Sequence, residues 1–321
     1  MSLTPETIEA AEKLLGIEYT AEERAAMLDN LEGQIAAARA SRAVGLANDE
    51  PPACRFDPRL PHTVLPAPGP TRFTSVEAKL PTADEDIAFA PLSHLAAWIA
   101  AGSLSSRRLT EIYLRRIEAL NPVLFAFATV APERPLAEAD AADRALAEGR
   151  HLGKLHGIPY GLKDLFDTAG LRTGWGAEPF ADRVPTTDAT IVTRLREAGA
   201  VLLGKTAVGA LAYGDIWCCG RARNPWNTAE GSSGSSAGSA SATAAGLCGF
   251  AIGTETLGSI TSPSHRCGTT GLRPTFGRVS RAGAMALCPS LDKVGPICRG
   301  AEDTAMVLAA LNAPSISACE A

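Results

Sequence analysis

The eight cysteines lack the spacing of a metal or redox site. None forms a C-x-x-C pair, so the pattern gives no basis for a zinc site or a thioredoxin-type motif. Several lie among apolar or small residues, where a thiol usually behaves as a small buried hydrophobe. We therefore expect free thiols rather than disulfides, as is typical of a cytoplasmic protein.

A signal peptide and an excess of charge are also missing. The first residues, MSLTPETIEAAEKLLGIEY, have acids and a helical pattern where a leader has a basic start and an apolar run. The longest uncharged stretch, between Glu230 and Glu255, is too rich in Gly and Ser to enter a bilayer. The formal net charge of −5 does not favour an anionic partner. We expect a cytoplasmic protein that binds neither nucleic acid nor membrane, and the sequence leaves a homodimer open.

No internal repeat is present, and proline divides the chain into three parts. Residues 1–49 predict a helical extension, with helices that begin after Thr4 and after Thr20. Eight prolines between Pro51 and Pro81 exclude a helix or central strand there, so we expect residues 50–86 to be an extended connector. Residues 87–321 form the main body.

In the main body, helical patterns alternate with short apolar runs. SRRLTEIYLRRIEALNP predicts a helix that stops at Asn121-Pro122, and ATIVTRLREAG predicts a helix that leads into the strand AVLLG. This alternation indicates an α/β protein with a mixed central sheet covered by helices.

Three short motifs match known catalytic or nucleotide-binding patterns but lack the context that each requires. GAVLLGKT, residues 199–206, fits a phosphate loop, yet its apolar centre predicts a buried strand that ends near Lys205. GSSAG fits a nucleophile elbow at Ser236, but no Asp lies between it and His265, and NPWNTAE before it predicts a turn-rich loop. SLDK, residues 290–293, has no partner motifs.

A serine hydrolase without a histidine needs another base, and a buried neutral lysine can supply it. The candidate is Lys163 in HGIPYGLKDLFDTAG, because its neighbours are mostly apolar residues and glycines. The alternative is that Lys163 is a surface lysine beside Asp164. The residues of this stretch, taken alone, would favour that alternative.

Taken together, several collinear motifs resemble the amidase signature family. They are HGIPYGLKD, TTDATIVTRLREAGAVLLGKT, RNPWN, GSSAGSASATAAG, FAIGTETLGSITSPSHRCGTTGLRPTFGRVSRAG and SLDKVGPICR, spread over roughly residues 90–312. The resemblance implies a mixed sheet covered by helices and a catalytic set of Lys163, Ser235 and Ser259. Ser235 lies 24 residues before Ser259, which is the family spacing, and is expected to follow a cis peptide bond.

The family's chemistry is the hydrolysis of small carboxylic amides through an acyl-serine intermediate. Ser259 would be the nucleophile, and Ser235 would relay its proton to Lys163. The backbone N–H groups of Thr256, Leu257, Gly258 and Ser259 would form the oxyanion hole. Neither a metal nor an organic cofactor is required.

Four departures from the family pattern leave alternatives open. Glu255 stands where many members have Asp, Leu257 replaces a glycine, and Thr261 takes a position that is often basic. Members also usually continue well past the point where this chain stops, so we expect an incomplete sheet with exposed apolar surface and weak activity.

Two other functions remain open beside a small-amide hydrolase. One is the A-type subunit of a glutamyl- or aspartyl-tRNA amidotransferase, which requires partner subunits; the lack of a basic residue at 261 and the helical extension disfavour it. The other is a non-catalytic scaffold, which the intact Lys163, Ser235 and Ser259 disfavour and the early chain end favours.

Overall fold

The computed structural model describes residues 3–45, 62–64 and 72–312. The chain divides into two compact units, Met1–Glu50 and Pro51–Ala321. Most of the proline-rich segment lies outside the described residues, so its expected extended form stays a prediction.

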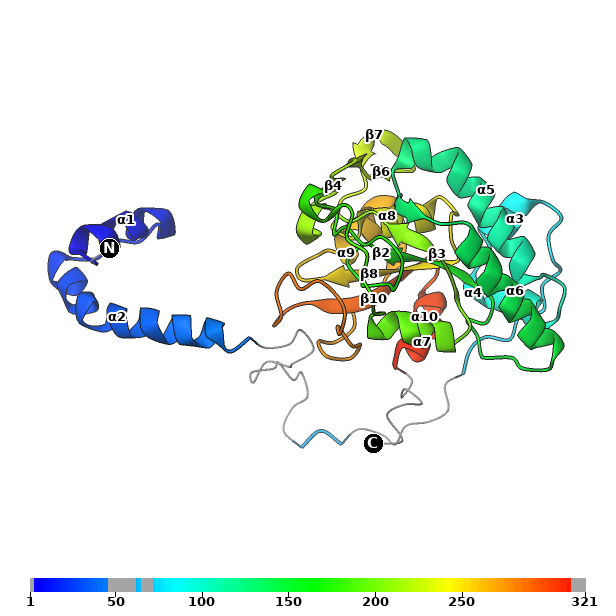
Figure 1. The fold of residues 1–321 in the computed structure, drawn as a ribbon, viewed down its shortest axis with the longest axis horizontal. Helices are drawn as coiled ribbons and strands as arrows, with labels where there is room; N and C mark the ends of the chain where they lie inside the picture. Colours follow the sequence, from blue (N-terminus) through cyan, green and yellow to red (C-terminus); the bar gives the residue numbers. More distant parts are fainter. Residues whose placement is uncertain (1–2, 46–61, 65–71, 313–321) are drawn as a thin grey trace. The chain divides into compact units, whose positions relative to one another are not determined.

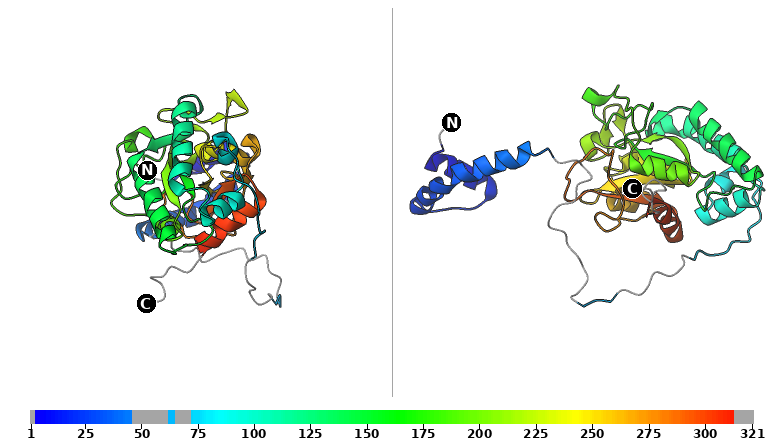
Figure 2. Two further views of the ribbon diagram at one scale, coloured as in Figure 1. Left: turned by 90° about the vertical axis from the view of Figure 1, so that its right-hand side faces the viewer. Right: turned by 60° about the horizontal axis from the view of Figure 1, so that its bottom comes forward.

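The first unit consists of α1 (Pro5–Leu15) and α2 (Ala21–Ala43), which pack against each other (Figure 2). Pro5 takes the first helical position of α1. At the start of α2, the Thr20 hydroxyl accepts from the N–H of Glu23, whose carboxylate accepts from the N–H of Thr20. Both predicted helix starts are therefore confirmed, and an Arg24–Glu12 ion pair of 2.6 Å joins the two helices.

The second unit alternates helices with short strands along the chain (Figure 1). Its helices are α3 (Asp84–Ala88), α4 (Leu92–Ala100), α5 (Ser106–Leu124), α6 (Glu133–Ala147), α7 (Thr190–Glu197), α8 (Ala237–Ala244), α9 (Thr261–Cys267) and α10 (Ala301–Asn312), with short 3₁₀ turns at Glu178–Phe180 and Ala210–Ala212. The sheet strands are β1 (Phe127–Val130), β2 (Pro159–Lys163), β3 (Val201–Thr206), β8 (Phe250–Glu255), β9 (Thr270–Gly271) and β10 (Lys293–Cys298).

These six strands form one mixed sheet in the order β1-β3-β2-β8-β10-β9. The three central strands β3, β2 and β8 are parallel to one another, and β1, β10 and β9 join by antiparallel pairing. The side chains of the central strands are buried along their whole length, as expected for strands covered on both faces. The predicted mixed sheet covered by helices is confirmed.

Helix α8 packs against β8, β2, β10 and β3, while α7 and α10 pack together on the opposite side in the view of Figure 1. Every residue from Ala237 to Thr243 is buried. A Cβ at Gly238 would lie 2.1 Å from the carbonyl oxygen of Ala126, so only glycine allows the helix to approach this closely. Helix α8, which consists of Ala, Gly, Ser and Thr residues, is thus packed closely against the sheet.

Two local predictions are wrong. Helix α5 does not stop at Asn121-Pro122 but continues to Leu124, with Pro122 inside its last turn. The Asn121 side chain stabilises that turn, because its amide accepts from the N–H of Phe127 at 2.8 Å and donates to the Phe127 carbonyl at 3.1 Å. Proline is tolerated there because little helix remains to be interrupted.

The second wrong prediction concerns NPWNTAE. This segment is not a loop but belongs to a hairpin of β6 (Arg223–Asn224) and β7 (Asn227–Gly231). The Asn224 carboxamide oxygen accepts from the N–H of Trp226 at 3.1 Å, so the turn residues that suggested a loop instead close a tight hairpin.

The described residues contain free thiols, but no metal-binding cluster and no membrane-spanning helix. Cys218, Cys219, Cys248, Cys267, Cys288 and Cys298 are free thiols, whereas Cys54 and Cys319 lie outside the described residues. Within the described ranges, no group of three or more His, Cys, Asp or Glu side chains is arranged to hold a metal ion. None of the described helices has the length and apolar character needed to cross a membrane.

Candidate active site

Lys163 ends the central strand β2 and is fully buried, which excludes the surface-lysine alternative. Its Nζ lies 2.8 Å from the Ser235 hydroxyl and 2.8 Å from the Thr254 hydroxyl, and 3.3 Å from the Thr254 carbonyl oxygen. Among the described residues no carboxylate forms an ion pair with this amine. The sequence therefore places a buried lysine against hydroxyl and carbonyl oxygens alone.

Burial has a clear effect on the Lys163 amine. Loss of hydration disfavours the charged form and lowers its pKa to about 7, although the negative charges of Asp292 and Glu255 act in the opposite direction. An amine with this pKa is largely neutral slightly above neutral pH, and only the neutral form can accept a proton. Lys163 is thus suited to act as a base.

Ser235 follows a cis peptide bond with Gly234, as the resemblance implied. The Gly234 backbone is in close contact with its neighbour, since a Cβ there would lie 1.8 Å from the carbonyl oxygen of Gly214. The Ser235 carbonyl accepts from the N–H of Gly209 at 3.3 Å. These contacts hold the Ser235 side chain, which is almost fully buried, against Lys163.

Ser259 lies in the loop between β8 and α9, nearer the surface than the other two residues. It is 9% exposed, whereas Ser235 is 1% exposed and Lys163 fully buried. Its carbonyl accepts from the N–H of Ser236 at 3.1 Å, and the hydroxyls of Ser233 and Ser262 are 2.7 Å apart. Two hydrogen bonds thus join the Ser259 loop to the Ser235 segment.

Glu255 anchors this loop from the end of β8. One carboxylate oxygen accepts from the N–H groups of Ile260 and Thr261, both at 2.9 Å. Burial would raise its pKa, but backbone N–H groups, including that of Gly258, outweigh this and lower it. The other oxygen pairs with Arg273 at 3.2 Å. Glu255 therefore remains charged and fixes the loop.

The four residues expected to form the oxyanion hole line the turn before α9. Gly258 has a φ of +86°, which favours glycine, and the Leu257 side chain is 89% exposed. The Thr256 hydroxyl donates to Asp292 at 2.5 Å, and the Thr256 carbonyl accepts from Lys293 at 3.0 Å. The Thr256 end of the turn is therefore held, while Leu257 at its centre is open to solvent.

The competing motifs occupy places that do not fit their proposed roles. Ser236 is fully buried, and its hydroxyl donates to the Thr254 carbonyl at 3.1 Å and accepts from the Thr254 N–H at 3.2 Å. These hydrogen bonds join the start of α8 to β8, so the Ser236 hydroxyl is not free to act as an elbow nucleophile. GAVLLGKT runs into strand β3, as predicted, and Lys205 lies at its end. Ser290 is exposed, unlike the buried Lys163 and Ser235.

Sequence reasoning missed Thr254 and the hydrogen-bond partners of the buried Lys205. Thr254 lies on the buried strand β8, where its apolar neighbours gave no sign of a polar role. Lys205 is fully buried, and its amine bonds to the Phe166 carbonyl and to the hydroxyls of Thr168 and Thr173. The signal available for Lys205 was a charged residue at the end of a predicted buried strand.

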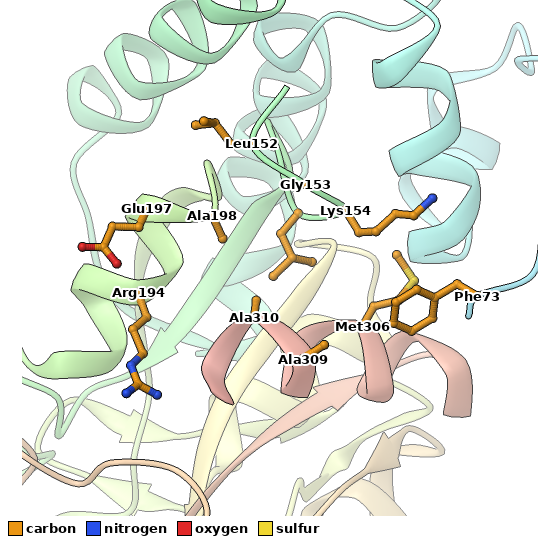
Figure 3. A pocket seen from close by; sticks show the side chains of 11 residues that line it. Phe73, Leu152, Gly153, Lys154, Arg194, Glu197, Ala198, Met306, Ala309 and Ala310 are labelled. Atoms are coloured by element: carbon orange, nitrogen blue, oxygen red, sulfur yellow. The ribbon is translucent and has the colours of Figure 1, made fainter. Parts of the chain in front are cut away.

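A cavity of about 300 Å³ lies near the end of the sheet at which strand β2 begins (Figure 3). It is lined by the segment just before β2, by α7 and α10, and by Phe73. Strands β2 and β3 are parallel and both begin at this end of the sheet, so their last residues, Lys163 and Thr206, lie at the opposite end. This cavity is therefore separate from the Lys163 cluster.

Comparison with known proteins identifies the family. The sequence model of the amidase family matches residues 108–317. The chain belongs to the amidase signature family. AmiD of Mycobacterium tuberculosis, provisionally named an amidase, is 46% identical over 233 residues, which cover 72% of this chain and 49% of that protein.

Two further relatives of this amidase signature chain extend the comparison. The A-type subunit of the glutamyl-tRNA(Gln) amidotransferase from Methylococcus capsulatus is 48% identical over 220 residues, 68% of this chain and 45% of that protein. The peptide amidase of Stenotrophomonas maltophilia has a TM-score of 0.66 and 41% identity, over 71% of this chain and 48% of that one. The chain spans about half the length of the relatives that it matches.

Proposed function

We propose that this chain carries the catalytic centre of an amidohydrolase that cleaves carboxylic amides through an acyl-serine intermediate. Ser259 is the nucleophile, Ser235 the proton relay and Lys163 the base. The observation that carries the proposal is the buried Lys163 amine, which lies 2.8 Å from the Ser235 hydroxyl and has a pKa of about 7.

The hydrogen bonds around Lys163 suit a neutral amine. Such an amine has two N–H donors and one lone pair. The hydroxyl and carbonyl oxygens of Thr254 can accept both N–H groups, which leaves the lone pair for the Ser235 hydroxyl. Protonation of the amine would direct an N–H at Ser235 instead, so only the neutral form lets Ser235 donate.

Acylation then requires no chemical group beyond these three residues and the substrate. The Ser259 oxygen attacks the amide carbonyl, its proton passes to Ser235, and the Ser235 proton passes to Lys163. As the tetrahedral intermediate collapses, the C–N bond breaks and the leaving amine takes a proton back through the same relay. Water then attacks the acyl ester, using Lys163 as base again, and releases the carboxylic acid and free Ser259.

The turn from Thr256 to Ser259 supplies N–H donors for the developing oxyanion. One such donor is worth about 3–4 kcal/mol in a transition state. The Glu255 carboxylate already interacts with the N–H of Gly258, so the donors of Leu257 and Ser259 are the better candidates. The exposed Leu257 side chain borders the entrance for substrate.

A second candidate function uses the same chemistry within an assembly. The 48% identity to the A-type component of a tRNA-dependent amidotransferase favours hydrolysis of a glutamine side-chain amide, with the ammonia passed to a partner protein. Thr261 instead of a basic residue disfavours this alternative, because in this chain Thr261 donates to Glu255 and offers no charge to a substrate carboxylate.

Fluorophosphonate labelling followed by peptide mapping tests the nucleophile. We expect one adduct per chain on the peptide that contains Ser259, and none in Ser259→Ala. Ser236→Ala is the matched control, since it removes a nearby buried hydroxyl that the mechanism does not use. Labelling that persists in Ser259→Ala and maps to Ser236 would overturn the assignment.

Substrate assays separate the two candidate functions. Small aliphatic amides, a C-terminally amidated dipeptide and free glutamine are compared with the isolated chain. Turnover of the first two supports the amidohydrolase, whereas turnover of glutamine alone supports the amidotransferase function. Labelling at Ser259 without hydrolysis of any of the three contradicts both.

A further inference from the structure

Cys218 and Cys219 form a pair of exposed thiols that the proposed reaction does not use. They are the two turn residues of a hairpin between β4 (Ile216–Trp217) and β5 (Gly220–Arg221). Both are exposed free thiols, and their sulfur atoms are 3.4 Å apart. The hairpin therefore presents two sulfur ligands side by side to solvent.

The turn that carries this pair is held in place on both sides. The Cys218 N–H donates to the Gly176 carbonyl at 2.9 Å. Gly220 lies against the Phe125 ring, because a Cβ there would be 3.1 Å from a ring carbon. Its φ of +147° also favours glycine at this position. The two sulfurs are thus positioned before any ligand arrives.

An apolar groove of about 770 Å³ begins at Cys219. Cys219 and Trp217 line it together with Phe125, Phe127 and Leu136. The Trp217 side chain is mostly buried, and its indole N–H has no hydrogen-bond partner among the described residues. A ligand bound to the sulfurs would therefore have aromatic and aliphatic surface next to it.

A direct disulfide does not suit this pair. Adjacent Cα atoms are about 3.8 Å apart, whereas the Cα atoms of ordinary disulfides are about 4.4–6.8 Å apart. A zinc ion does not suit it either, because structural zinc needs four ligands and the described residues contain no cluster of three or more His, Cys, Asp or Glu. The suitable ligand accepts two sulfurs and brings its own third substituent.

Trivalent arsenic bound to one organic group has these properties. We propose that Cys218 and Cys219 form a dithiol site for organic trivalent arsenicals, with the organic substituent in the groove lined by Trp217. Soft thiolate sulfur favours such thiophilic centres over hard cations. The site is distinct from Lys163, Ser235 and Ser259.

The binding step requires no oxidant or reductant. Each thiol loses its proton as a sulfur–arsenic bond forms, and the arsenic–oxygen bonds of the arsenical break. The two protons leave with that oxygen as one water molecule, and arsenic stays trivalent. Burial and the hydrogen bond with Cys219 raise the pKa of the Cys218 thiol to about 11, which slows alkylation but leaves the thiol proton available to the departing oxygen.

Phenylarsine oxide is the probe, and intact-mass analysis with peptide mapping is the measurement. We expect one phenylarsenic adduct per chain on the peptide that contains both cysteines. A dithiol such as 2,3-dimercaptopropanol should remove it, whereas an equal concentration of a monothiol should not. Removal by the monothiol at the same concentration, or mapping to another cysteine, overturns the proposal.

Single substitutions test whether both sulfurs bind. Cys218→Ser and Cys219→Ser should each weaken binding at least about 100-fold, because the second bond to a tethered sulfur is an intramolecular step. Cys288→Ser is the matched control and should bind as the parent does. Unchanged affinity in either turn variant, with cooperative melting retained, refutes a two-sulfur site.

The groove is tested by changing the substituent. Phenylarsine oxide should bind about tenfold more tightly than its methyl counterpart, because the ring buries more apolar surface. Trp217→Ala should remove most of that difference and leave the methyl compound unaffected. Equal affinities for the two compounds in the parent chain would mean that the substituent does not occupy the groove.

Discussion

Lys163 and Lys205 are two fully buried lysines on neighbouring strands with different surroundings. In the parallel register of β2 and β3, Leu162 lies opposite Lys205, and Lys163 opposite Thr206. The Lys163 amine contacts only hydroxyl and carbonyl oxygens, and its pKa falls to about 7. The Lys205 amine is also desolvated, but the charge of Asp164 partly offsets this, and its pKa falls only to about 8.

The difference shows how the same burial serves two purposes. Around Lys205, three oxygen partners from residues 166–173 hold a segment in place, and Asp164 affects the amine through its charge. Burial raises the pKa of Asp164 itself to about 6, against the effect of the Lys205 charge. The Lys163 amine instead contacts the Ser235 hydroxyl at 2.8 Å, with which it can exchange a proton. The two buried amines therefore differ in what they contact: Lys163 reaches a serine of the proposed centre, whereas Lys205 joins the oxygens of one neighbouring segment.

The largest expected effect is on catalysis. Lys163→Arg should lower kcat/KM at least about 10³-fold, because arginine stays protonated and cannot act as a base. The matched variant is Lys205→Met, which removes the other buried amine and should lower kcat/KM less than about tenfold. Steady-state amide hydrolysis measures both.

Retained turnover in a folded Lys163→Arg protein would remove lysine from the mechanism. An equal loss in both variants would mean that the two lysines act alike. Circular dichroism on both proteins checks the fold.

The next effect is on stability, and it should reverse the order of the two lysines. Lys205→Met leaves the Phe166 carbonyl and the hydroxyls of Thr168 and Thr173 without their donor. It also removes the positive charge that favours the ionised Asp164 carboxyl, so it should cost about 1–3 kcal/mol. Lys163→Met should change the free energy of unfolding by less than about 1 kcal/mol, because relief of the amine's desolvation offsets its lost hydrogen bonds. Urea denaturation gives both values.

A double variant sharpens that result. Asp164→Asn combined with Lys205→Met should be less destabilised than the sum of the two single variants, because the uncompensated charge is removed along with its partner. Simple additivity would show that Asp164 and Lys205 are not energetically coupled.

Stability should also depend on pH through Lys163. Its pKa is about 7 in the folded chain and about 10.4 in an unfolded one. Between these values the unfolded chain binds more protons, so the stability rises with pH, by at most about 1.4 kcal/mol per unit. Below pH 7 both states are protonated and this dependence disappears.

The slope is measured by urea denaturation from pH 6 to 9. It should be smaller in Lys163→Met, and the reduction should begin near pH 7; in Lys205→Met it should begin near pH 8. Identical slopes in the parent and in Lys163→Met would contradict a depressed pKa.

The smallest effect tests a neighbour of Lys163. Thr254→Val removes a hydroxyl that accepts from the amine at 2.8 Å, and this hydroxyl stabilises the charged form more than the neutral one. The acid limb of the pH–rate profile, expected near pH 7, should therefore move to lower pH by about half a unit. A shift to higher pH would mean that Thr254 instead favours the neutral amine.

Much of the fold was predictable because its signals are local. The helix starts after Thr4 and Thr20 follow from capping residues, and the strand before Lys205 follows from a short apolar run. The continuation of α5 through Pro122 did not follow, because it depends on a hydrogen bond to Phe127. The β6–β7 hairpin was missed because its turn residues resembled a loop.

The candidate site was predictable in its residues but not in its surroundings. Lys163, Ser235 and Ser259 came from a family pattern, and the structure brings Lys163 and Ser235 into hydrogen-bond contact. Thr254 and the partners of Lys205 were missed, because their importance comes from contacts between residues that are far apart in the sequence. The assignment of Ser259 as nucleophile and of the turn donors stays a prediction.

Helix α8 has a consequence for the exchange of backbone hydrogens with solvent. Its residues from Ala237 to Thr243 are all buried. Their amides can therefore exchange with deuterium only when the packing of α8 against the sheet opens. Leu257, in the turn before Ser259, is 89% exposed, and we expect its amide to exchange without such an opening. Isotope labelling would thus divide the proposed centre into a slow part, the helix that follows Ser235, and a fast part, the exposed turn before Ser259.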